Sequence, residues 1–312
     1  MQTINVLTSA FHRAAARKRM IVFYWFFHTL CAALAALPVL GIAIPQLSHS
    51  DYGAELMKQF DIAAIAELIS TAGEAGSPAG IAILLSALLA LAGATFLAGG
   101  CVKLLVRDEV PYSPAEFWEG CGRYFWRFLR LALYFLVPYL LLLALHSGLI
   151  RAIAKHYEPG IVELPVIYAN RTVRVLILLL AGLTATAADL AKVHLVVTDS
   201  RKSLRAFLGS LRLVITRPMT VFPVWLLLAL LLSAATALYL AAMHRLGILL
   251  ILFLAQQIYI FFRILLRMTS WAAAAEIDTL LRPLPPEPVP VPVPVASEPP
   301  AFEAGAQQDF TI

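Results

Sequence analysis

Residues 81–106 read IAILLSALLALAGATFLAGGCVKLLV, an apolar run in which Lys103 is the only charged side chain. An α-helix rises 1.5 Å per residue, so this run is long enough to cross the hydrocarbon core of a bilayer, which is about 30 Å thick. The run therefore predicts a transmembrane helix.

Five further runs of similar length and polarity predict five more spans, at residues 20–44, 128–150, 173–197, 219–243 and 247–268. Of all 312 residues, 61% are hydrophobic and only 14% are charged, whereas soluble domains carry about 25% charged residues. This composition excludes a water-soluble globule. The predicted fold class is all-α, a polytopic bundle of six transmembrane helices that form three hairpins within residues 1–282.

Positive charge predicts the orientation of these spans, because cytoplasmic segments of membrane proteins keep an excess of Lys and Arg. The chain has 24 such residues, and an amino terminus on the cytoplasmic side puts eighteen of them on that side and six on the other. We therefore expect a multi-pass protein of the inner (cytoplasmic) membrane with both termini in the cytoplasm.

Short amphipathic basic segments are predicted to introduce the three hairpins on the cytoplasmic side. In the second, Ser113 to Glu116 has the pattern of a capping box with proline at the first helical position, so a helix is expected to begin there and to lie along the membrane interface. In the third, an apolar stripe over residues 204–215 lies opposite Arg201, Arg205 and Arg212, and Pro218 then bends the chain into the fifth span. The first, around Phe11, is a weaker case.

Arginines on these segments are the predicted contacts with anionic lipid headgroups, namely Arg123, Arg127, Arg130, Arg201, Arg205 and Arg212. Each basic residue near an anionic surface contributes about 1 kcal/mol of attraction. The alternative is that they serve only anchoring and topology. The net charge of +5 comes from residues beside apolar spans, so it does not predict nucleic-acid binding.

The stretch from Phe207 to Pro218, FLGSLRLVITRP, follows a run from Ala188 to Lys192, ADLAK. With these features, residues 1–280 resemble bacterial six-helix inner-membrane proteins and are similar to the membrane domain fused to some glycerophosphodiester phosphodiesterases. The resemblance implies a fold and a compartment, and it implies no catalytic residues.

Asp189, Lys192 and His194 form the candidate polar site within the fourth span. Ionisable groups inside a membrane are costly and often functional. Asp189 and Lys192 are three residues apart and can pair on one helical face, or Asp189 can pair with a nearby arginine. Structural pairing and a proton or substrate relay are the two interpretations.

Catalytic and cofactor motifs are absent from the sequence: it has no HExxH, no GxSxG and no Walker loop. We therefore expect no enzyme, no metal site and no cofactor, although His28 and His194 lie at similar predicted depths and could in principle hold a haem.

The last residues, 283–312, begin with PLPPEPVPVPVPVASEPP, which favours extended polyproline II and predicts a disordered cytoplasmic tail. The tail can act as a spacer or dock a protein partner. The expected function is a non-catalytic scaffold, assembly or accessory membrane protein. The alternative is a small-solute or lipid transporter that uses Asp189, Lys192 and Gln256-Gln257.

Overall fold

The computed structural model describes residues 2–48, 78–107, 112–157, 163–245 and 249–282, and the Pro-rich tail lies outside them. Within these ranges the chain forms helices and no strand. The helices are α1 (Gln2–Ala16), α2 (Lys18–Ser48), α5 (Pro78–Val106), α6 (Pro114–His156), α7 (Glu163–Val197), α8 (Ser203–Thr216), α9 (Pro218–Arg245) and α10 (Leu249–Leu281).

Six of these helices, α2, α5, α6, α7, α9 and α10, are long and apolar enough to cross a membrane. They coincide with the six runs expected from hydropathy, which supports a multi-pass membrane protein. Helices that follow one another in the chain contact each other, α2 with α5, α6 with α7, and α9 with α10.

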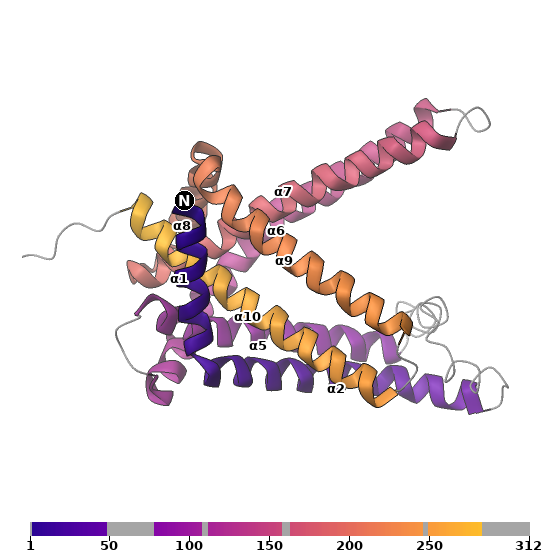
Figure 1. Ribbon diagram of the computed structural model, residues 1–312, viewed down its shortest axis with the longest axis horizontal. Coiled ribbons are helices and arrows are strands. Elements are labelled where there is room, and N and C mark those ends of the chain that lie inside the picture. Colours follow the sequence, from indigo (N-terminus) through magenta and orange to yellow (C-terminus); the bar gives the residue numbers. More distant parts are fainter. Residues whose placement is uncertain (1, 49–77, 108–111, 158–162, 246–248, 283–312) are drawn as a thin grey trace, which may run out of the picture.

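The long helices meet at one end of the molecule and diverge toward the other, as Figure 1 shows. We call the end that also holds α1 and α8 the convergent end. Buried apolar side chains concentrate there, in the last turns of α5 and α7, the first turns of α6 and the second half of α10. Toward the other end, the same helices expose many leucines. The core of the protein is therefore the convergent end.

Glycines allow α5 and α6 to approach closely within this core. A β-carbon at Gly99 would lie 2.7 Å from the carbonyl oxygen of Gly120, and one at Gly100 would lie 2.6 Å from that of Phe117. Small residues at such positions let helix backbones come into contact. The close contact between α5 and α6 therefore depends on Gly99 and Gly100.

Helix α6 begins at Pro114, as predicted, but it continues without a break to His156. The separate segment expected over residues 114–127 is thus the first part of a 43-residue helix. No proline or other helix breaker stands between Trp126 and Leu131, so the backbone ladder continues. Ser113 has the extended backbone of a capping residue, but its side chain makes no capping hydrogen bond.

Helix α8 is a separate helix, and Pro218 begins α9 as expected. The helix packs on α6, α7 and α9. Its buried side is made of small residues, Ser203, Ala206 and Ser210, together with Val214. Part of the predicted apolar stripe points away from the bundle, since Leu204, Leu208 and Ile215 are exposed.

Candidate functional site

Asp189 on α7 is the most heavily bonded side chain of the convergent end. Both Nη atoms of Arg267 on α10 donate to its carboxylate, at 2.8 and 2.7 Å. Ser270 Oγ donates at 2.8 Å and Trp271 Nε1 at 3.1 Å. The Asp189 side chain is only 3% exposed. Four donors from α10 therefore hold one buried carboxylate of α7.

Lys192 lies beside this carboxylate as a second cation. Its Nζ is 3.9 Å from Asp189 Oδ1 and 5.9 Å from the centre of the Trp271 ring. The Arg267 guanidinium lies 5.0 Å from the same ring centre. The expected neighbourhood of Asp189 and Lys192 is thus present, but the direct hydrogen bonds go to Arg267.

His194 does not join this cluster. Its Nδ1 is 3.1 Å from Asp278 Oδ2, and Arg282 Nη1 lies 3.4 Å from Asp278 Oδ1. The Asp278 side chain is 1% exposed. The three polar residues predicted as one site therefore belong to two separate pairings, both between α7 and α10.

His28 of the haem alternative and Gln256-Gln257 of the transporter alternative do not join the Asp189 cluster either. The ring of His28 packs on Tyr24, with 4.8 Å between ring centres. Trp25 Nε1 donates to Gln257 Oε1 at 3.0 Å, and Gln256 is exposed. In the described ranges, no group of three His, Cys, Asp or Glu residues is arranged to hold a metal ion.

Four of the six predicted headgroup arginines gather at one surface concavity of about 580 Å³. We call it the arginine concavity; it is lined by Arg123, Trp126, Arg127, Arg130, Asp199 and Arg201. The other two lie elsewhere. Arg205 lines a neighbouring concavity of about 330 Å³ together with His194 and Lys202, and Arg212 is exposed on α8.

Asp199 organises one side of the arginine concavity from the turn between α7 and α8. Arg127 Nη1 donates to Asp199 Oδ1 at 2.8 Å and to the carbonyl oxygens of Asp199 and Ser200 at 3.1 and 3.3 Å. Arg123 pairs with the same carboxylate, and Tyr124 Oη donates to it at 3.2 Å. The backbone of Asp199 has φ 45°, a conformation in which Asp and Asn are enriched.

Burial alone would raise the pKa of Asp199, but the hydrogen bonds and positive charges of Arg127 and Arg123 outweigh it and hold that pKa below its usual value. Asp199 is therefore ionised at neutral pH. It neutralises part of the charge of these two arginines and fixes their position.

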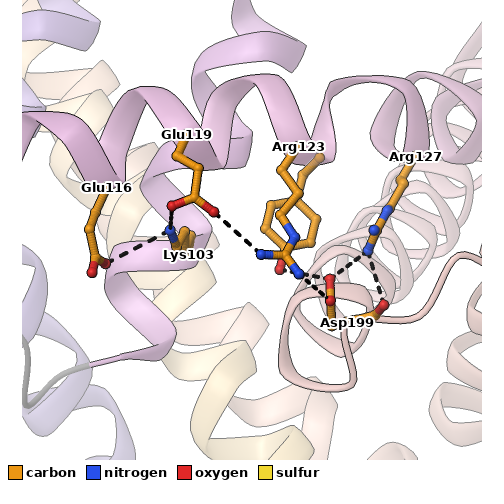
Figure 2. Close-up of polar contacts among 7 residues, drawn as sticks. Lys103, Glu116, Glu119, Arg123, Arg127 and Asp199 are labelled. Atoms are coloured by element: carbon orange, nitrogen blue, oxygen red, sulfur yellow. Dashed lines mark hydrogen bonds and ion pairs between the residues drawn. The ribbon is translucent and has the colours of Figure 1, made fainter.

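The first two turns of α6 extend this network toward α5, as Figure 2 shows. Lys103, which is buried on α5, donates to Glu119 at 2.9 Å and lies 3.8 Å from Glu116. Glu119 also accepts from Arg123 at 3.3 Å. One chain of charges thus joins α5, α6 and the turn after α7.

Sequence reasoning missed Asp199, Asp278 and Arg267 as partners. Asp199 offered a weak local signal, because it lies between Thr198 and Ser200 at the end of an apolar span, where turns form. For Arg267 no local signal exists, since it lies 78 residues from Asp189 in the chain. Only the packing of α7 on α10 brings these two together.

Comparisons of the chain with protein-family models, with curated proteins and with solved structures found no match.

Proposed function

We propose that this chain is a non-catalytic scaffold, assembly or accessory protein of the bacterial inner membrane. Its helices would cross as three hairpins, with the convergent end in the cytoplasm and α1 and α8 at the interface. The resemblance carried by residues 188–192 and 207–218 to the membrane domain of glycerophosphodiester phosphodiesterases is part of the same proposal.

The observation that carries this proposal is the use of the ionisable groups within the spans. Asp189 is held by four donors and is 3% exposed. Lys103 is likewise buried and pairs with Glu119, and the buried Asp278 pairs with His194. A transport path or an active site needs polar groups that can exchange partners with a substrate. Groups engaged in this way instead support a rigid helical core at the convergent end, which we call the hub.

Helix α8 supports an interfacial position. Its small residues face the bundle, while Leu204, Leu208 and Ile215 form a stripe on the outside. Arg205 and Arg212 are exposed beside this stripe. A helix with apolar and basic sides of this kind lies in the plane of a membrane surface, with the apolar side among acyl chains.

The orientation can be tested by cysteine labelling, because the three natural cysteines are buried. Thr216 is exposed at the convergent end, and Lys155 is exposed near the far end of α6. In intact spheroplasts, a membrane-impermeant maleimide should label Lys155→Cys and should label Thr216→Cys only after lysis. The reverse pattern would contradict the proposed topology.

The scaffold role can be tested by purifying the protein in mild detergent with and without residues 283–312. A control variant carries a scrambled tail of the same composition. We expect a partner at constant stoichiometry with the natural tail, and its loss with both altered tails.

The opposing result is a protein without a partner that conducts a solute in liposomes. If Asp189→Asn abolished that flux while the variant kept its fold, the transporter alternative would replace the scaffold. Equal flux through the wild-type chain and the Asp189→Asn variant would show that transport does not use Asp189.

A further inference from the structure

The four guanidinium groups of the arginine concavity are not equivalent. Arg123 and Arg127 are held by Asp199. Arg130 donates its Nε to the carbonyl oxygen of Trp126 at 3.2 Å, a bond within its own helix. Among the residues that the structure describes, no carboxylate pairs with Arg130 or with Arg201.

The charge of the concavity is therefore unbalanced. Within the lining, four guanidinium groups face the one carboxylate of Asp199, and Glu119, which lies outside the lining, also pairs with Arg123, so the uncompensated positive charge lies at Arg130 and Arg201. Guanidinium groups present paired N–H donors that match the oxygens of a phosphate. The two arginines without a carboxylate are thus the groups with donors available for an anion.

The position of the concavity along α6 sets it at the depth of lipid phosphates. Exposed leucines begin at Leu133 and continue through Leu136, Leu140 and Leu141. Arg130 lies three residues before Leu133, which is about 5 Å along a helix axis. Trp126, which lines the concavity, is 66% exposed. Tryptophan at the end of an apolar span is typical of the headgroup region.

Helix α8 fixes the second half of the lining. Arg201 lies in the turn between α7, which ends at Val197, and α8, which begins at Ser203. Ser203 Oγ, at the start of α8, donates to the carbonyl oxygen of Arg127 at 3.3 Å, and Arg127 in turn binds the turn residues 199 and 200. These bonds hold the turn against α6, so that Arg201 and Arg130 line the same space.

We propose that the arginine concavity binds one phosphate group of an anionic phospholipid, with Arg130 and Arg201 as direct ligands and Arg123, Arg127 and Asp199 as the preformed support. The proposal rests on the membrane placement given above. The volume of the arginine concavity, about 580 Å³, is larger than that of a bare phosphate ion and accommodates a glycerophosphate headgroup. A free phosphate ion shares the same chemistry, and the experiment separates the two sources.

The test uses the full chain in nanodiscs that contain phosphatidylcholine with a minor fraction of phosphatidylglycerol. Native mass spectrometry after release into detergent counts the phosphatidylglycerol molecules that remain bound. The variant is Arg130→Gln/Arg201→Gln. The matched control is Arg107→Gln/Arg217→Gln, which removes the same charge from exposed arginines outside the concavity.

We expect the wild-type chain and the control to retain one phosphatidylglycerol molecule and the Arg130/Arg201 variant to lose it, with affinity lower by about tenfold or more. An equal loss in both double variants would show unspecific attraction and would overturn the proposal. Retention by the Arg130/Arg201 variant would overturn it too.

Inorganic phosphate, added to the lipid-bound protein at constant ionic strength, distinguishes the sources. If it displaced the lipid at millimolar concentration and chloride did not, the site would belong to free phosphate, and the lipid proposal would fail. Should the glutamine variant unfold in detergent, Arg130→Lys/Arg201→Lys keeps both charges but loses the paired donors. Lipid retention should then fall, and unchanged retention would contradict a defined site. These results do not depend on residues 283–312, so the site and the scaffold role fail separately.

Discussion

Replacing Asp189 by asparagine should weaken the fold substantially, because it removes the charge at the centre of the contact between α7 and α10. Breaking one side of a buried ion pair costs about 3–5 kcal/mol. The Arg267 side chain is 40% exposed and can turn to solvent after the substitution, which lowers the expected loss to about 2–3 kcal/mol.

Asp199→Asn is the matched control, because this carboxylate also binds two arginines. Its side chain is 45% exposed, against 3% for Asp189. Asparagine also tolerates the backbone conformation of residue 199. The control should therefore lose at most about 1 kcal/mol.

The free energy of unfolding of both variants can be measured by titration with sodium dodecyl sulfate in mixed micelles, followed by helical circular dichroism. If Asp189→Asn proved no more destabilising than Asp199→Asn, burial would not be what gives the α7–α10 contact its strength, and the account of the hub would be refuted.

Three further results are expected. Because the pKa of Asp199 is lowered from 3.8, the stabilisation by its carboxylate is complete above that value and is lost as the pH falls through the lower folded-state pKa. Binding of phosphatidylglycerol should therefore be constant from about pH 5 to about pH 8. A change in retention across this range would argue against the assignment. Gly99→Ala should lower the free energy of unfolding by about 1–3 kcal/mol, because its β-carbon would meet the backbone of the facing helix. The control Gly148→Ala, which has open space around it, should be neutral or stabilising by up to about 1 kcal/mol in the same titration. Equal effects of the two substitutions would contradict the close packing of α5 on α6. Gln257→Leu leaves the Nε1 donor of Trp25 without its acceptor and should lower the free energy of unfolding by about 1–2 kcal/mol, and a stable variant would show that this bond is not formed.

Hydropathy predicted the helices well because the length needed to cross a bilayer leaves a strong local signal. Five of the six expected spans lie within long helices, and the described part of the sixth, residues 249–268, lies within α10. The ends were less certain. Pro218 separates α8 from α9, whereas α6 runs from Pro114 through the expected boundary at Phe128 because nothing in between interrupts a helix.

The pairing of polar residues was less predictable because it depends on tertiary packing. Local spacing placed Lys192 near Asp189, and the structure agrees, with 3.9 Å between Nζ and Oδ1. The stronger partner, Arg267, comes from another helix. The gathering of Arg123, Arg127, Arg130 and Arg201 depended on the turn at Asp199, which no periodic pattern marks.

The divergence of the helices from the convergent end (Figure 1) has a consequence for the surrounding bilayer. A protein of this outline takes up more area in the leaflet at its open end than in the leaflet at its hub. In a bilayer, acyl chains would cover the leucines that the described helices expose where they separate, such as Leu140 on α6 and Leu178 on α7. The shell of lipids in direct contact with the protein is therefore unequal, with more chains touching it in one leaflet than in the other.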